Sequence, residues 1–392
     1  MRVLRFQMHG LKLHESETLS MDLYASDNVR STSFTYEALG NGSPVRILTT
    51  IGIAGINASG KTTALRALDL VLCIANGKQI GSIANDLMPL IGMVKDSLNT
   101  DIIFEHEHHI YRLTSELKHD PHSTGGFSFV RETLAIFPRR MSKAMLSKAF
   151  TDLKWKTLTT RGIGVPGQNG ELTREVLDYL PNDRSISGAL VKGSASNVMA
   201  NLTPLLPSFV LNPVPQVFSL FDPSIESIFA EGERLHLKFK GEDSDYEMNP
   251  MSLINTVSAG TLRGSFILSQ ALTVLSTGGY LLVDEIENSI NKQLVFTIMD
   301  LFASSATNPR GAVLVFTTHY PELLDHFTRK DNIWFAVRRS SGFSLVHLAD
   351  NLSRADVKKS VAFFANEIQG TAPSAKMVRQ LRDFTKEIVN AR

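Results

Sequence analysis

One short segment near the N-terminus carries the strongest chemical signal in the sequence. Residues 55–62, Gly-Ile-Asn-Ala-Ser-Gly-Lys-Thr, match the G-x-x-x-x-G-K-S/T pattern of a phosphate-binding loop. The glycines let backbone N–H groups surround phosphates, the Lys61 ammonium reaches the β- and γ-phosphates, and the Thr62 hydroxyl is a ligand for Mg²⁺. A helix beginning here directs the positive end of its dipole at the anion. The expected nucleotide-binding residues are Asn57, Ala58, Ser59, Gly60, Lys61, Thr62 and Thr63.

A second motif is an apolar strand that ends in two acids. The segment Tyr280-Leu-Leu-Val is followed directly by Asp284 and Glu285. We expect Asp284 to hold Mg²⁺ through water and Glu285 to polarise the water that attacks the γ-phosphate. Many surface strands end in Asp-Glu without a catalytic role, so the pattern alone is weak. Its position downstream of a phosphate loop favours the catalytic interpretation.

Two further polar signals accompany the acid pair. The apolar run 312–316 is followed by Thr-Thr-His319, and a histidine there can donate a hydrogen bond to a γ-phosphate. The segment Val-Ser258-Ala-Gly260 precedes a predicted helix, about 24 residues ahead of the acid pair, and Ser-x-Gly at a helix N-terminus is an anion-binding arrangement. The candidate catalytic residues are therefore Lys61, Glu285 and His319, the candidate metal ligands are Thr62 and Asp284, and the further nucleotide contacts are Ser258 and Gly260.

The elements that must position these residues alternate between strands and helices. Helical periodicity follows the phosphate loop, where Leu65, Leu68 and Leu72 recur on one face. Apolar runs typical of buried strands occupy 46–53, 279–283, 312–316 and 333–337, and helical patterns occupy 260–275 and 291–303. This alternation predicts a mostly parallel α/β sheet.

The middle of the chain has weaker periodicity. Residues 102–104 and 109–113 predict a short antiparallel pair. From about 120 to 215, Gly, Pro, Asn and Ser accumulate, which indicates an insertion with helical pieces, including a basic one from Arg139 to Lys156. Residues 217–230 are predicted to be helical.

In this order and with this spacing, the four motifs resemble those of the ABC-type ATPase superfamily. More narrowly, the layout is similar to the AAA_15/AAA_21 ATP-binding proteins related to the OLD nucleases and to ATPase subunits of bacterial anti-phage systems such as Septu and PARIS. The phrases that carry this narrower resemblance are Asp284-Glu-Ile-Glu-Asn-Ser, Asp350-Asn-Leu-Ser-Arg-Ala-Asp and Gly370-Thr-Ala-Pro. The resemblance covers roughly residues 1–115 and 217–375.

The resemblance implies an α/β fold, an ABC-type P-loop NTPase head with a mixed or parallel central sheet and an α-rich insertion. Four parts are expected: 1–118, the N-terminal part of the head with the phosphate loop; 119–215, a mainly helical and loop insertion; 216–350, the C-terminal part of the head; and 351–392, a helical tail.

The resemblance also implies a way of working. In ABC-type heads the signature of one subunit closes on the ATP of another, so Ser258 and Gly260 would act in trans, and ATP with Mg²⁺ would hold together a homodimer or higher oligomer. The implied activity is hydrolysis of ATP to ADP and phosphate by a dimerising switch. Such a switch would control a separate effector protein in a bacterial anti-phage defence system. No nuclease-like acidic cluster is visible after His319, so the effector would be a companion protein.

Bulk composition excludes several classes of protein. The net charge is +1 at pH 7 and hydrophobic residues make up 43%, so no global charge excess indicates nucleic-acid binding. A single cysteine, Cys73, excludes an internal disulfide framework. No apolar run approaches the ~20 residues that span a bilayer, and the N-terminus lacks a secretory apolar core. We therefore expect a cytoplasmic protein without a membrane partner.

Two clusters and one alternative function stay open. The basic segment from Arg139 to Lys156 fits either a nucleic-acid phosphate surface or a solvated helix face. On a strand, His106 and His108 would share a face as two metal ligands, but no third ligand is visible, so packed or solvated histidines are favoured. The alternative function is a RecF- or SMC-like DNA-repair head that binds DNA directly, which keeps nucleic acid as a candidate partner.

Overall fold

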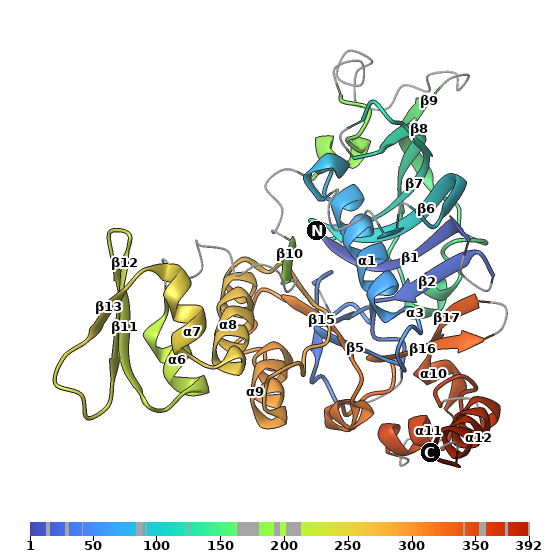
Figure 1. Cartoon of the computed structure of the whole chain (residues 1–392). Coiled ribbons are helices and arrows are strands. Elements are labelled where there is room, and N and C mark those ends of the chain that lie inside the picture. The colour runs from blue at the N-terminus through green and yellow to red at the C-terminus, as the bar shows by residue number, and fades with distance from the viewer. Residues whose placement is uncertain are drawn as a thin grey trace.

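Two six-stranded sheets with one long helix between them form the body of the molecule (Figure 1). The computed structural model describes residues 1–12, 16–27, 31–40, 42–83, 89–90, 92–123, 125–162, 180–191, 197–200, 213–339, 342–352, 358–372 and 375–390. Parts of the 119–215 insertion and of the tail phrases beginning at Asp350 and Gly370 lie outside these residues.

The first sheet is antiparallel throughout, in the order β2-β1-β6-β7-β8-β9. Its strands are β1 (Arg2–Leu11), β2 (Thr18–Asp22), β6 (Val94–His106), β7 (His109–His119), β8 (Phe127–Ile136) and β9 (Lys156–Gly162). Glu107 and His108 form the tight turn between β6 and β7 with positive φ angles of 49° and 64°. A short pair, β3 (Thr35–Tyr36) and β4 (Ile47–Leu48), lies outside this sheet.

The second sheet is mixed, in the order β10-β14-β15-β5-β16-β17. Its first five strands are parallel and β17 is antiparallel to β16. The strands are β5 (Thr50–Ala54), β10 (Asn197–Ala200), β14 (Tyr280–Val283), β15 (Val313–Thr318), β16 (Ile333–Arg339) and β17 (Gly342–His347). Parallel neighbours end at the same edge of the sheet, so the segments that follow β5, β14 and β15 come together.

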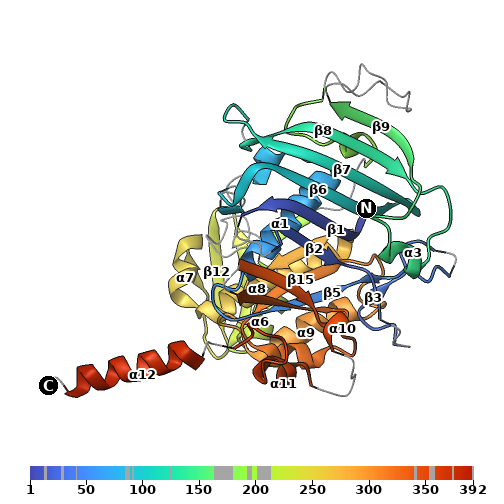
Figure 2. The ribbon, with the colours of Figure 1, turned by 90° about the vertical axis from the view of Figure 1, so that its right-hand side faces the viewer.

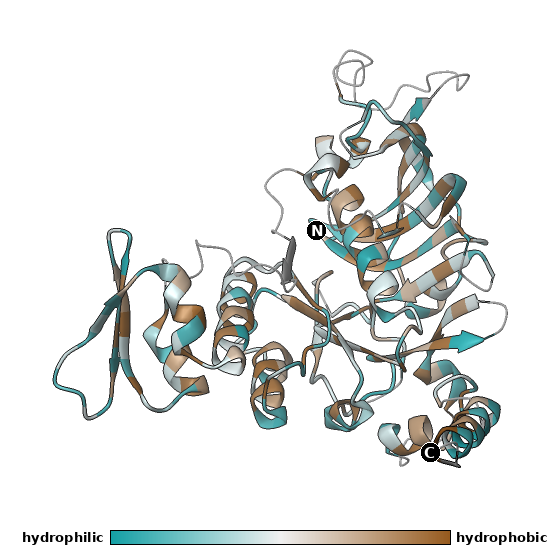
Figure 3. Cartoon of the chain, in the orientation of Figure 1, coloured by the Kyte–Doolittle hydropathy of each residue, from teal (hydrophilic) through white to brown (hydrophobic). Residues whose placement is uncertain are grey.

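Both faces of the mixed sheet are buried, which explains its almost unbroken apolar strands. Tyr280 and Leu282 face the core around α1 (Lys61–Ala75), whereas Leu281 and Val283 face the core around α8 (Ala259–Thr277) and α9 (Lys292–Ala303). Figure 3 shows the resulting hydrophobic strands within the body. The mixed α/β fold predicted from the sequence is confirmed.

The remaining helices are short, apart from the last. They are α3 (Lys143–Ser147), α6 (Pro215–Phe221), α7 (Leu253–Thr256), α10 (Leu348–Asn351), α11 (Lys359–Phe364) and α12 (Ala375–Asn390), with 3₁₀ turns η1 (Ile80–Ile83), η2 (Ile186–Ala189), η3 (Pro250–Ser252) and η4 (Pro321–His326). Figure 2 shows α12 leading away from the body. It lies within the helical tail predicted over 351–392.

A small antiparallel sheet projects beside α6 and α7, and its first strand lies where the last part of a helix over 217–230 was predicted (Figure 1). It consists of β11 (Ile225–Glu231), β12 (Arg234–Phe239) and β13 (Tyr246–Met248). The helical prediction is wrong beyond Phe221, because Pro223 disfavours a helical conformation at the preceding residue. Asp222 is indeed extended, and the chain continues as a strand.

The prediction of a mainly helical and loop insertion at 119–215 is also corrected in the described residues. β8 and β9 extend the antiparallel sheet, so a boundary at 118/119 separates strands that are hydrogen-bonded to one another. Along β8, buried Phe127 and Phe129 alternate with less buried neighbours, a period-two pattern that weak overall periodicity concealed. The basic segment is not one helix: α3 is five residues long, and Lys156 begins β9.

A buried carboxyl group within this sheet gives a testable pH dependence. Glu132 accepts hydrogen bonds from Ser185 Oγ at 2.7 Å and Ile186 N at 3.1 Å, and lies 3.4 Å from Arg161. Burial raises the pKa of Glu132 to about 7, against the opposing effect of Arg161 and these hydrogen bonds.

Glu132→Gln should therefore flatten the pH dependence of stability. Because the folded pKa lies above the unfolded value, the contribution of Glu132 is fully present below pH ~4.5 and is lost as pH rises through about 7. Urea unfolding at pH 5 and pH 8 should show wild type losing about 2 kcal/mol more than the variant over this interval. Equal losses in the two proteins would assign the pH dependence to other groups.

Candidate active site

The loop between β5 and α1 has a backbone that only glycine permits at two positions. A Cβ at Gly55 would lie 2.5 Å from the carbonyl oxygen of Ala336. Gly60, the residue before α1, has φ of 100°, and a Cβ there would lie 2.5 Å from the Phe343 ring. The loop thus keeps the shape that lets its N–H groups face an anion at the start of α1.

Lys61 is buried beneath this loop. Its Nζ donates to the carbonyl oxygens of Gly55 at 2.8 Å and Ile56 at 3.1 Å, and it lies 3.2 Å from His319 Nδ1. Burial lowers the pKa of the Lys61 ammonium, while the carboxylates of Glu285 and its neighbours oppose this shift. The lysine is therefore held in place as a donor at the centre of the loop.

Asp284, at the end of β14, joins two threonine hydroxyls. Thr62 Oγ1 donates to its Oδ2 at 2.8 Å, and Thr317 Oγ1 donates to its Oδ1 at 2.5 Å. A hydroxyl and a carboxylate are the oxygen ligands that Mg²⁺ prefers. Thr62 and Asp284 therefore fit the predicted metal role, and Thr317 fixes the orientation of the carboxylate.

Glu285 has a strained backbone that its neighbours stabilise. Its φ is 49°, uncommon for a residue other than glycine. Its N–H donates to Thr317 Oγ1 at 2.7 Å, and its carbonyl oxygen accepts from Arg263 Nη2 at 2.7 Å. Arg263 Nη2 also donates to the carbonyl oxygen of Asp284 at 2.9 Å. The Glu285 side chain lines the cavity described below.

His319 connects the lysine to the acid. Its Nε2 lies 2.9 Å from Glu285 Oε1, and its Nδ1 faces Lys61. A neutral imidazole satisfies both contacts only with the proton on Nε2, donating to Glu285 while Nδ1 accepts from the ammonium. The backbone N–H of His319 donates to Glu287 Oε1 at 2.7 Å, which holds the loop after β15.

These residues surround one cavity of about 470 Å³, large enough for a nucleotide. All seven predicted residues of the loop and helix start line it, together with Glu285 and His319. Met93, Arg338 and Phe343 complete the wall, and sequence reasoning missed all three. They come from distant segments, so no local pattern could have found them.

The predicted signature lies at the N-terminus of α8. Ser258 is the N-cap, and its Oγ accepts from Thr261 N at 3.0 Å. Ser258 is exposed and Gly260 is partly exposed, and neither lines the cavity of their own chain. Within the described residues, the structure therefore brings the other predicted site residues together but leaves the signature apart from them.

Three supporting residues were not predicted, and each has a signal next to a motif. Thr317 lies two residues before His319, Glu287 two residues after Glu285, and Arg263 three residues after Gly260. Burial lowers the pKa of Arg263, opposed by Glu285, Glu287 and Asp284. Because Arg263 is on α8, it links the signature helix to the backbone of the acid pair.

The histidine cluster does not form a metal centre. His106 ends β6 and His108 lies in the turn with positive φ, so they do not share the strand face that the disfavoured two-ligand alternative requires. Throughout the described ranges, no group of three or more His, Cys, Asp or Glu side chains could hold a metal ion. Cys73 is buried in α1, and burial raises its pKa to about 12.

Comparison with known proteins finds a family match to part of the chain. Residues 164–325 match the family model described as "AAA domain, putative AbiEii toxin, Type IV TA system". This segment is under half of the chain; it contains the signature, the acid pair and His319 but begins after the phosphate loop. The SMC head domain from Thermotoga maritima is similar over 88% of this chain and 99% of that chain, with 12% identity and a TM-score of 0.40. No curated protein matches the chain.

The fold, the phosphate-loop cavity and the match of residues 164–325 to an AAA-domain model support a P-loop ATPase. Among the helices in the described ranges, none combines the length and the apolar character needed to cross a membrane.

Proposed function

We propose that the protein hydrolyses ATP with Mg²⁺ and uses ATP to close two copies into a head-to-tail dimer. The observation that carries this proposal is the arrangement of the motifs. One cavity is lined by Lys61, Glu285 and His319, whereas the exposed Ser258 lies outside it at a helix N-terminus. A site with every element except its signature is suited to receive that element from a second copy.

In the proposed reaction, the loop N–H groups and Lys61 bind the β- and γ-phosphates, and Thr62 and Asp284 hold Mg²⁺. When bound there, Mg²⁺ would supply positive charge to offset the charge that develops on the phosphate oxygens. Glu285 orients the attacking water and accepts its proton. His319, which donates to Glu285 and accepts from Lys61, contacts the γ-phosphate and so registers whether it is present.

The finer role proposed is control of a separate effector in bacterial anti-phage defence. The matching family model names a type IV toxin–antitoxin system, and the motif phrase Asp284-Glu-Ile-Glu-Asn-Ser resembles that of the AAA_15/AAA_21 and OLD-like proteins. ATP-driven closure would present or withhold a surface for the effector. The proposal places the protein in the cytoplasm with a companion protein.

A trapped variant tests the dimer. Glu285→Gln should shift from monomer to dimer on addition of ATP and Mg²⁺, measured by size-exclusion chromatography with light scattering. Adding Ser258→Arg should keep nucleotide binding, because the cavity of the chain stays intact, but should abolish the shift. Ser276→Arg, an exposed serine at the other end of α8, is the matched control and should dimerise normally.

Two outcomes contradict this model. One is an unchanged mass with ATP in the trapped variant. The other is loss of nucleotide binding by the folded Ser258→Arg protein, which would place the signature in the site of its own chain. Purification of the tagged Glu285→Gln protein from its native host with ATP should yield a stoichiometric companion protein, and recovery of the dimer alone would contradict effector control.

A further inference from the structure

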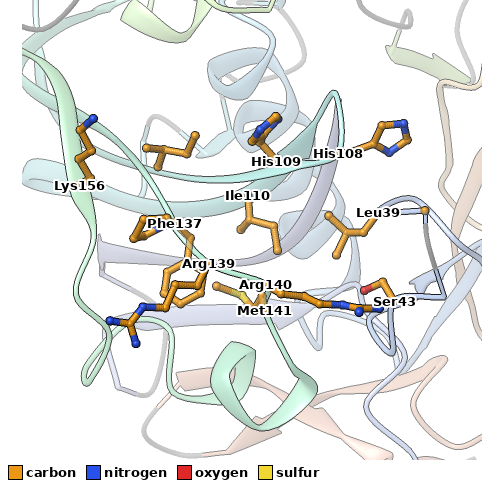
Figure 4. A pocket seen from close by; sticks show the side chains of 13 residues that line it. Leu39, Ser43, His108, His109, Ile110, Phe137, Arg139, Arg140, Met141 and Lys156 are labelled. Atoms are coloured by element: carbon orange, nitrogen blue, oxygen red, sulfur yellow. The ribbon is translucent and has the colours of Figure 1, made fainter.

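A second cavity, of about 620 Å³, shares no lining residue with the nucleotide cavity. Its basic side chains come from three separate segments: His108 and His109 from the β6–β7 turn and the first residue of β7, Arg139 and Arg140 from the segment after β8, and Lys156 from the start of β9. We call this cavity, defined by these five residues, the basic groove. Figure 4 shows the two histidines along one side, the two arginines along the other, and Lys156 near one end.

The charge of the basic groove is not neutralised by its own lining. Three permanent cations line it and no carboxylate does. Arg139 and Lys156 are exposed, and in the described part of the chain neither side chain has an ion-pair partner. Arg140 Nη2 donates to Gly42 O at 3.1 Å. The nearest acid along the chain, Glu107, lies in the turn but does not line the cavity. The groove therefore favours an anion.

The floor of the basic groove is apolar and rigid. Ile110 and Phe137 lie between the two basic sides in Figure 4, and Phe137 N donates to Ile110 O at 2.8 Å. The Trp155 ring packs against Phe137 edge to face, with 5.4 Å between ring centroids. A floor that does not have to be ordered on binding lowers the entropic cost of a complex.

The two histidines are oriented by backbone carbonyls. His108 Nδ1 lies 2.9 Å from Ala38 O, and His109 Nδ1 lies 2.9 Å from Glu107 O. A carbonyl oxygen only accepts, so Nδ1 carries a proton in both rings. The rings are therefore fixed along one side of the groove.

From this arrangement we propose that the basic groove binds the sugar–phosphate backbone of nucleic acid. Cations distributed along both sides match a row of phosphates better than one compact anion, and the apolar floor matches the sugar rings between phosphates. No base-reading set is needed, so binding is independent of sequence. The inference goes beyond the proposed ATPase, because the two cavities share no residue.

Salt-dependent binding of the full-length protein tests the proposal. We would measure fluorescence anisotropy of a labelled 20-nucleotide DNA single strand, the matching duplex and an RNA of the same sequence, without ATP, across increasing salt. Three contacts predict a slope of log K against log salt of about −2 for a single strand and about −2.7 for duplex DNA. The nucleic acid that binds with the highest affinity identifies the form that the basic groove prefers.

A matched pair of double variants locates the site. Arg139→Ala with Lys156→Ala should weaken binding about 10-fold or more at ~0.1 M salt and reduce the slope by about 1.4 for a single strand and about 1.8 for duplex DNA. Lys148→Ala with Lys154→Ala removes the same charge from exposed positions of the same segment outside the groove. This control should bind within about twofold of wild type.

The ATPase activity measured without nucleic acid should be equal in wild type and in both double variants, which separates this proposal from the proposed function. If both double variants weakened nucleic-acid binding equally, binding would depend on diffuse surface charge, and the assignment of the site to the basic groove would be overturned. Undiminished binding by the Arg139→Ala, Lys156→Ala variant would also overturn the proposed site. So would failure of the wild-type protein to bind any of the three nucleic acids, and binding to vesicles that contain phosphatidylserine would then assign the groove to a lipid surface.

Discussion

Lys61→Ala should reduce the affinity for ATP by at least about 100-fold, or about 2.7 kcal/mol. In the structure the ammonium is buried and donates to the carbonyl oxygens of Gly55 and Ile56, so it is already positioned under the loop. Alanine removes the only side-chain cation of the loop and leaves the phosphate charge without its charge-assisted hydrogen bonds. Titration calorimetry with ATP and Mg²⁺ measures the loss.

Two controls sharpen this result. Lys148→Ala, at an exposed position outside the cavity, should keep normal affinity. Thr62→Ala should lose the Mg²⁺-dependent part of the affinity and keep the part measured in EDTA, because only the hydroxyl contact to Asp284 and the metal is removed. Normal ATP binding by folded Lys61→Ala protein would refute the phosphate-loop assignment.

Glu285→Gln should lower kcat by about 10²- to 10⁴-fold while changing the Kd for ATP by no more than about threefold. The amide keeps the volume of the side chain and can still accept from His319 Nε2, so the cavity should keep its shape. It cannot accept the proton of the attacking water. Single-turnover phosphate release and an independent binding titration separate the two parameters.

Glu287→Gln is the matched control for this prediction. Glu287 lies two residues away and accepts from the backbone N–H of His319, which positions the histidine without reaching the cavity lining. Glu287→Gln should keep a higher kcat than Glu285→Gln. The reverse order, with Glu285→Gln near wild-type turnover and Glu287→Gln inactive, would transfer the role of general base to Glu287.

Sequence by itself determined the local chemistry of this protein. The phosphate loop is followed by a helical period, and the acid pair and His319 each follow an apolar run. The sequence next to each motif therefore predicts the helix or strand that positions it. Parallel strands end at the same edge of a sheet, so three motifs at strand ends could be expected to meet. The structure does bring them around one cavity.

Tertiary structure decided what depends on contacts between distant segments. The hydrogen bonds of Arg263 to the backbone of Asp284 and Glu285, and the wall formed by Met93, Arg338 and Phe343, join residues far apart in the chain. The positive φ of Glu285 has no propensity signal either, because glutamate disfavours it and only the surrounding hydrogen bonds hold it.

The middle of the chain shows the same division. Its weak periodicity concealed two strands, because β8 and β9 are stabilised by pairing within a large sheet rather than by a strong local pattern. The basic groove arises from that sheet. Arg139 and Lys156 are 17 positions apart and belong to different elements, so only the pairing of β8 with β9 makes them line one cavity.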